Sequence, residues 1–162
     1  MQTQMQLLDL ITPTPETALA RIVDQLKCGP EAAAALLQRF GTLGGIASAG
    51  RDELATVDGM SEAAADFLTC LRPVAAALAM ESLQDRDVIS SWAALTDYVR
   101  TAQARYPREV FRCLYLDRKN RLIADEVASV GTIDHAPVIP REVARRALAL
   151  NASALILVHN HP

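Results

Sequence analysis

Two histidines, His159 and His161, are the residues of this sequence whose types and spacing best suit chemistry. They follow the apolar run ALILV at residues 154–158, within the segment His-Asn-His-Pro. Successive side chains of a strand point to opposite faces, so we expect both imidazoles on one face and Asn160 on the other. Zinc binds neutral imidazole, and a catalytic zinc site uses three protein ligands and one open position. The pair therefore predicts two ligands of a zinc site, although two polar side chains at the frayed end of a chain would show the same spacing.

The elements that must position this pair lie in the second half of the sequence. Residues 109–117 and 121–132 have strand composition and flank the polar turn DRKN, which predicts a hairpin. A helix opened by Pro140 follows, and then a strand at residues 154–158 that we expect to be buried. A helix at residues 91–106 precedes the hairpin. This order predicts a sheet with helices packed against it.

The first half has a different composition. Its segments are rich in alanine and have helical periodicity, and Pro73 is expected to begin a new helix. Residues 1–83 carry 10 acids and 5 bases, whereas residues 84–162 carry 9 acids and 11 bases. The polar segment SLQDRDVISS at residues 82–91 separates the two compositions. We therefore predict a mixed α+β protein with an all-helical domain at residues 1–83 and an α/β domain at residues 84–162.

Several protein classes are disfavoured by composition. The chain is 51% apolar and 22% charged, which is ordinary for a soluble globular protein. No apolar run approaches the roughly 20 residues needed to cross a membrane, and the N-terminus lacks the features of a secretory signal. Cys28, Cys70 and Cys113 are far apart and fit neither a disulfide framework nor a metal knuckle. We expect a cytoplasmic protein with reduced thiols and no membrane partner.

Residues 109–162 closely resemble the bacterial RadC family, part of the JAMM/MPN superfamily of zinc metallopeptidase-like domains. The phrases SVGTIDHAPVIPREV and LILVHNHP carry the resemblance most specifically, and the helical first half is also similar to that family's. The family's metal motif is His-x-His-Pro followed by a serine and an aspartate, and His159, His161 and Pro162 match its first part. The resemblance implies the N-terminal portion of a JAMM/MPN-like domain, with a cytidine-deaminase-like sheet, flanking helices and Zn²⁺ as cofactor.

The resemblance also implies a general base. The superfamily uses a glutamate before or in the first strand of the domain, and Glu109, directly ahead of VFRCLYL, matches that position. Zinc lowers the pKa of a bound water to about 7, so a nearby carboxylate can take its proton as the water attacks a carbonyl. Glu126 in the hairpin and Glu142 in the first turn of a helix are competing carboxylates. His135 is expected to brace its loop rather than to bind metal.

The stretch LATVDGMSEAAADFLTCL at residues 54–71 resembles a helix-hairpin-helix motif, whose glycine-containing turn offers backbone N–H groups to a DNA phosphate. The second glycine and the basic residue usual in that motif are absent, and Asp58, Glu62 and Asp66 would repel a phosphate. We expect weak or no nucleic-acid binding. A helical turn within a small bundle is the leading interpretation, and weak DNA contact or an assembly surface are the others.

Two functional hypotheses follow. The first is a zinc-dependent metallopeptidase-like hydrolase that cleaves a peptide or isopeptide bond in a peptide or protein substrate, with Glu109 activating water. The serine and aspartate of the motif have no counterpart here, so we expect a fragment that lacks the third metal ligand and has little or no peptidase activity. The second is a DNA-repair-associated DNA-binding or protein-interaction module without catalysis. A basic patch around the hairpin would favour it, and none is visible in the sequence.

The charge distribution predicts weak retention on heparin. Affinity for a polyanion depends on neutralising its charges with Lys and Arg, and neither half of the chain is strongly basic. The protein should therefore elute at low salt when a linear salt gradient is applied to a heparin column. Retention to high salt would instead revive the DNA-binding hypothesis.

Overall fold

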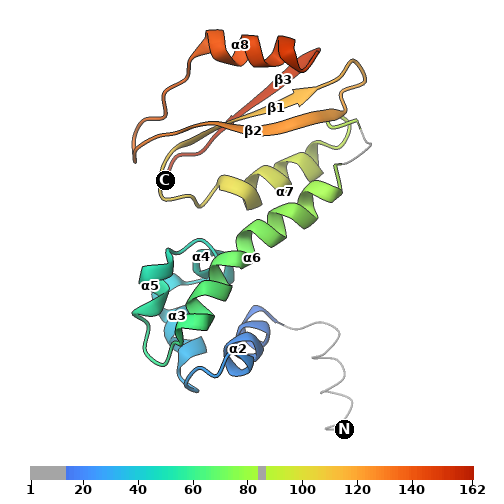
Figure 1. Cartoon of the computed structure of the whole chain (residues 1–162). Coiled ribbons are helices and arrows are strands. Elements are labelled where there is room, and N and C mark those ends of the chain that lie inside the picture. Colours follow the sequence, from blue (N-terminus) through green and yellow to red (C-terminus); the bar gives the residue numbers. More distant parts are fainter. Residues whose placement is uncertain (1–13, 84–86) are drawn as a thin grey trace, which may run out of the picture. The chain divides into compact units, whose positions relative to one another are not determined.

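A computed structural model describes residues 14–83 and 87–162, in two compact units that divide between Arg72 and Pro73 (Figure 1). The first unit contains helices α2 (Pro15–Gln25), α3 (Ala32–Phe40), α4 (Leu43–Ile46), α5 (Arg51–Ala55) and the first half of α6 (Glu62–Glu81). The second contains the rest of α6, then α7 (Trp92–Gln103), β1 (Val110–Leu116), β2 (Leu122–Val130), α8 (Pro140–Ala149) and β3 (Ala154–His159). Helices followed by a small antiparallel sheet confirm the predicted mixed α+β class.

An apolar core of its own holds the first unit together. Leu19 of α2, Leu36 of α3, Leu54 of α5 and Leu68 of α6 are all fully buried in it. The turn between α5 and α6 contains Gly59 at a φ of +78°, a conformation that glycine adopts without strain. The helical first half predicted from the sequence is therefore present.

Helix α6 runs without a break through Pro73, so the expectation that this proline begins a new helix is wrong. Proline removes one backbone hydrogen bond and normally breaks or kinks a helix. Packing on both sides of it supports the helix here, because Leu68 is buried in the first core while Ala76 and Ala79 pack against the second. The same packing explains why the units divide after Arg72, ahead of the predicted boundary between residues 83 and 84.

Because α6 is continuous, it is long and apolar enough to cross a membrane by length and composition. The helix has 20 residues, and its most apolar window has a mean hydropathy of 1.4 and is 17% buried. The expectation that no apolar stretch approaches this length is therefore wrong. Core helices of soluble proteins meet the same criterion, and Asp66 on α6 forms an ion pair with Arg51 at 2.6 Å. Length and composition alone are thus weak support for a membrane span.

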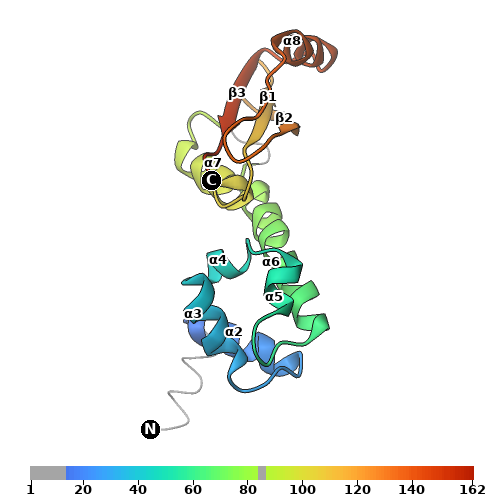
Figure 2. The same cartoon turned by 90° about the vertical axis from the view of Figure 1, so that its left-hand side faces the viewer.

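The sheet of the second unit has the strand order β2-β1-β3, and both pairings are antiparallel. Figures 1 and 2 show α7 on one side of this sheet and α8 on the other. Leu114 and Leu116 of β1 belong to the core shared with α7, whereas Phe111, Cys113 and Tyr115 belong to the core beneath α8. The central strand is therefore buried on both faces, and the predicted hairpin of β1 and β2 is confirmed.

Strand β3 lies at an edge of the sheet, and only one of its faces is well covered. Ile156 and Val158 pack against the core shared with α7, while Leu155 is 37% exposed and Leu157 is 55% exposed. The expectation of a buried strand is wrong for that second face. The run ALILV is apolar on both faces, and its periodicity cannot tell which face another element covers.

A buried ion pair connects β1 to β2 beneath α7. Arg112 donates hydrogen bonds of 2.6 Å to both carboxylate oxygens of Asp125, and the Tyr98 hydroxyl of α7 donates to the same carboxylate. The side chains of Arg112 and Asp125 are only 14% and 5% exposed. Burial, together with the hydrogen bond to Asp125, raises the pKa of Tyr98 above its usual value. Tyr98 therefore stays a neutral donor at physiological pH.

Removing Asp125 should strongly destabilise this unit. Asp125→Ala leaves the buried Arg112 guanidinium without a carboxylate partner, so we expect the free energy of unfolding to fall by about 3–5 kcal/mol. Urea denaturation followed by circular dichroism measures the change. Asp97→Ala, on the exposed face of α7, is the matched control and should change stability by no more than about 0.5 kcal/mol. Equal effects of the two substitutions would contradict the importance of the buried pair.

Candidate metal centre

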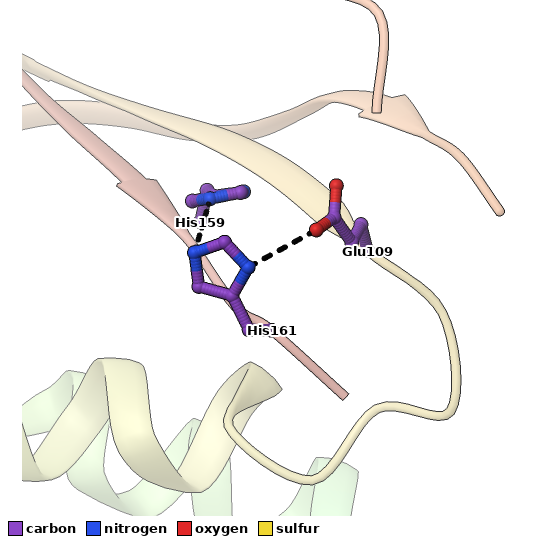
Figure 3. Close-up of side chains that lie close together, drawn as sticks. All are labelled: Glu109, His159 and His161. Carbon is purple, nitrogen blue, oxygen red and sulfur yellow. Dashed lines mark hydrogen bonds and ion pairs between the residues drawn. The ribbon is translucent and has the colours of Figure 1, made fainter. Parts of the chain in front are cut away.

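Glu109, His159 and His161 come together because β1 pairs antiparallel with β3. Phe111 lies directly opposite His159 in this pairing, so Glu109, two residues before Phe111, lies beside the residues that follow His159. Figure 3 shows the three side chains close together, with His161 between the other two. The structure thus assembles the three residues singled out in the sequence, although Glu109 and His159 are 50 positions apart (159 − 109).

The three side chains form a group that could hold a metal ion. The Nε2 atoms of His159 and His161 are 3.0 Å apart, and His161 Nδ1 is 3.2 Å from Glu109 Oε1. One ligand atom from each residue can be chosen so that all three lie within 4.8 Å of one another. Zinc binds such nitrogen and oxygen donors, and two nitrogens at about 2.0 Å from a tetrahedral ion are about 3.3 Å apart. The donors present therefore fit a zinc ion.

The Glu109 carboxylate favours Nε2 over Nδ1 as the metal-binding nitrogen of His161. A carboxylate beside Nδ1 favours the tautomer that carries its proton there and donates it, which leaves a lone pair on Nε2. That Nε2 faces the Nε2 of His159. The Glu109 side chain is 7% exposed, whereas that of His161 is 78% exposed. A carboxylate fixed inside the protein therefore orients an imidazole at its surface.

The loop after β2 holds the backbone of Glu109. Its N–H donates to Thr132 O at 2.7 Å, and its carbonyl accepts from Gly131 N at 2.8 Å. A Cβ at Gly131 would lie 1.8 Å from His135 O, so this close approach requires glycine. His135 takes part in the loop through its carbonyl, which accepts from Thr132 N. Its imidazole does not belong to the metal-capable group found among the described residues.

The two competing carboxylates are paired with arginines of α8. Glu126 forms an ion pair of 2.5 Å with Arg146, and hydrogen bonds from Arg146 lower the pKa of that carboxyl. Glu142 pairs with Arg145 at 2.8 Å within the same helix. Glu109 is therefore the one of these three glutamates that lies beside the histidines.

A cavity of about 360 Å³ lies between the hairpin, α8 and the segment that precedes α8. Phe111 lines it, and Phe111 is the register partner of both His159 and Ser129. Ser129 also lines the cavity, and its hydroxyl is buried without a hydrogen-bond partner. Val138 and Ile139 of the lining are 44% and 61% exposed. The cavity is therefore next to Ser129, Phe111 and His159, which lie side by side on the three strands. This cavity could not be predicted from the sequence, because its lining comes from separate elements.

The helix-hairpin-helix-like turn of the first unit is more nearly neutral than its sequence suggested. Glu62 and Asp66 of α6 both pair with Arg51 of α5. The carbonyl of Gly59 in this turn accepts a 2.7 Å hydrogen bond from Gly29 N. The turn before α6 is therefore hydrogen-bonded to the turn after α2.

A small basic patch lies at the tip of the hairpin, contrary to the expectation from the sequence. Arg118, Lys119 and Arg121 surround a shallow depression there. Asp117 in the same turn accepts hydrogen bonds from the backbone N–H groups of Lys119 and Arg121. These bonds, above all that from Arg121, lower the pKa of the Asp117 carboxyl, so one negative charge remains within the patch.

Comparison with known proteins confirms the resemblance read from the motifs. Residues 89–162 match the family model described as RadC-like JAB domain. A UPF0758 protein of Rhodobacter capsulatus is 53% identical to this chain, and one of Ruegeria pomeroyi is 54% identical, each over 127 residues. These residues are 78% of this chain but only 59% and 57% of the two relatives. The chain therefore spans less than two thirds of the relatives it matches.

Substituting either histidine of the group should weaken zinc binding. His159→Ala and His161→Ala each remove a nitrogen donor. Loss of a group that only orients a ligand raises a metal dissociation constant by about 10–100-fold, so loss of a donor should raise the zinc dissociation constant by more than that. Competition with a chromophoric chelator measures the constant. His135→Ala, in a loop outside the group, is the control and should bind as the parent does. Unchanged binding by His159→Ala would place the metal elsewhere.

Proposed function

Residues 89–162 form a RadC-like JAB domain, and from this premise we propose that the domain is a zinc-dependent hydrolase of amide bonds. One observation carries the proposal. The buried carboxylate of Glu109 lies 3.2 Å from His161 Nδ1, while the Nε2 atoms of the two histidines are 3.0 Å apart. Structural zinc sites are closed by four protein ligands, whereas this group of the described residues offers two imidazoles and one carboxylate, which favours hydrolytic chemistry.

We assign the ion as Zn²⁺, held by His159 and His161, because zinc commonly takes neutral imidazole ligands. When bound, zinc supplies a Lewis acid that activates a water molecule and polarises a carbonyl group. The chain contributes the orientation of the donors, since the Glu109 carboxylate, 3.2 Å from Nδ1 of His161, favours a proton on that nitrogen and thus a lone pair on Nε2 toward the ion.

Glu109 is proposed as the general base and acid. Its carboxylate takes a proton from the attacking water and later gives a proton to the leaving amine, as general acid–base catalysis requires. The hydrogen bonds of its backbone to residues 131 and 132 hold the side chain next to the histidines. Because Nδ1 and Nε2 of His161 face different directions, Glu109 orients His161 and transfers protons in turn rather than at the same time.

A peptide or protein is the proposed substrate, and the cytoplasm is the proposed location. The cavity beside Phe111 offers an apolar rim next to the row of residues that carries His159, which suits a peptide side chain. Three cysteines that are far apart in the sequence fit no disulfide framework, which favours a reducing compartment.

A DNA-binding or protein-interaction module remains the alternative. The basic patch of Arg118, Lys119 and Arg121 at the hairpin tip favours contact with a polyanion. The patch is small and contains Asp117, and it lies at the opposite end of β1 from Glu109. We therefore favour the hydrolase over this alternative.

The full-length Rhodobacter capsulatus relative, assayed beside this chain, tests the hydrolase. The zinc-loaded relative should cleave internally quenched peptides, and phenanthroline should stop the cleavage. Glutamine at the position that aligns with Glu109, assayed with the zinc site saturated, should lower kcat by about 10²–10⁴-fold, the usual contribution of a general base. This chain, assayed under the same conditions, shows whether residues 1–162 suffice for cleavage.

Two outcomes would contradict these expectations. Failure of the relative to cleave any member of a library that varies every residue around the bond would refute the proposed hydrolase. Cleavage by the relative that phenanthroline does not slow would refute the dependence on zinc.

A further inference from the structure

We infer that Asn160 is a positioning residue that holds Glu109 in place against the two histidines. The inference rests on the proposed metal centre but concerns a residue to which neither the motifs nor the comparisons assign a role. Asn160 lies between His159 and His161 in the chain, yet it is only 7% exposed. Its side chain points away from theirs, as the alternation of a strand requires.

The amide of Asn160 binds the backbone on both sides of Glu109. Its Oδ1 accepts a hydrogen bond of 2.9 Å from Val110 N, and its Nδ2 donates to Arg108 O at 3.0 Å and to Tyr106 O at 3.3 Å. One N–H and two carbonyls therefore receive complementary partners from a single side chain. This pattern also fixes which end of the amide is oxygen, because only one orientation satisfies all three.

These bonds connect the two chain segments just beyond the last backbone pair of β1 and β3. The backbone pairing of the two strands runs from Leu116↔Ala154 to Phe111↔His159. Beyond that point Asn160 uses its side chain to bind Val110, while the loop after β2 binds the backbone of Glu109 from the other side of β1. The segment that carries Glu109 is thus held from both neighbouring strands.

Asparagine is the side chain that these contacts require. Aspartate has the same shape and could accept from Val110 N, but its carboxylate would face the carbonyls of Tyr106 and Arg108. Each of those partly buried acceptors would lose its hydrogen bond to Asn160 and face a negative charge instead, which is unfavourable. Glutamine is one methylene longer and would not fit the same three positions without displacing the backbone.

The functional consequence follows from the distance between Glu109 and His161. The carboxylate selects the Nδ1–H tautomer of His161 only while it stays near the 3.2 Å separation seen here. Asn160 fixes the backbone of residues 106–110 relative to residue 160, and His161 is the next residue. Releasing that segment should therefore weaken both the tautomer preference and the affinity for metal.

Asn160→Asp tests the inference with two measurements. In metal-free protein, ¹⁵N chemical shifts of the histidine rings should show His161 as the Nδ1–H tautomer in the parent, and a mixture of tautomers in the variant. The zinc dissociation constant should rise by about 10–100-fold, the range typical of losing an outer partner of a ligand. The d–d spectrum of Co²⁺ added in place of zinc should change as well.

Two further variants separate positioning from general stability. Tyr98→Phe removes hydrogen bonds from the same unit that connect Tyr98 to Asp125 and Arg112 rather than to Asn160 or residues 106–110, and it should leave the tautomer and the zinc affinity unchanged. Asn160→Ser removes the same three contacts without adding charge. It replaces Asn160→Asp in the same measurements if the aspartate variant does not fold.

The results distinguish this inference from the proposed function. If the parent binds no zinc but Asn160→Asp still changes the His161 tautomer, the metal centre fails and the positioning role stands. If folded Asn160 variants keep the parent's tautomer, zinc affinity and Co²⁺ spectrum, the positioning role is overturned. An equal change in Tyr98→Phe would also overturn it, because the effect would then be general destabilisation.

Discussion

The antiparallel pairing of β1 with β3 is the constraint on which the candidate site depends. It places Phe111 opposite His159 and so brings Glu109 beside a histidine pair that is far away in the sequence. A slip of one residue would turn every side chain of β3 to the other face of the sheet. Packing prevents that slip, because Ile156 lies opposite Leu114 and both belong to the core shared with α7. Burial of apolar residues on one face thus sets the position of polar residues on the other.

Buried polar groups fix the positions of side chains that apolar packing alone leaves loosely defined. Arg112 and Asp125 are paired beneath α7, and Asn160 binds the backbone beside Glu109. Apolar contacts are not directional, whereas hydrogen bonds between buried groups depend on distance and angle. The three bonds of Asn160 can therefore hold the Glu109 carboxylate as close to its required position as a metal site needs. The same arrangement makes these positions sensitive to substitution.

Some of this could be predicted from the sequence. The strand composition on either side of the DRKN turn gave the hairpin, and the spacing of His159 and His161 gave two donors on one face. Glu109 came from resemblance, because no local pattern connects residues 50 positions apart (159 − 109). The buried role of Asn160 was not foreseen, since its partners are backbone atoms of a distant segment. Pro73 misled the prediction because packing on both sides of it outweighs the usual effect of proline.

Anomalous diffraction from crystals of this chain grown with zinc, recorded on both sides of the zinc edge, tests the metal centre most directly. If the metal centre is correctly assigned, we expect one strong peak of anomalous density at about 2.0–2.1 Å from the Nε2 atoms of His159 and His161, the usual zinc–imidazole distance. We also expect Glu109 to remain next to His161 Nδ1. A peak on His135 or Cys70, with none between the two histidines, would contradict it.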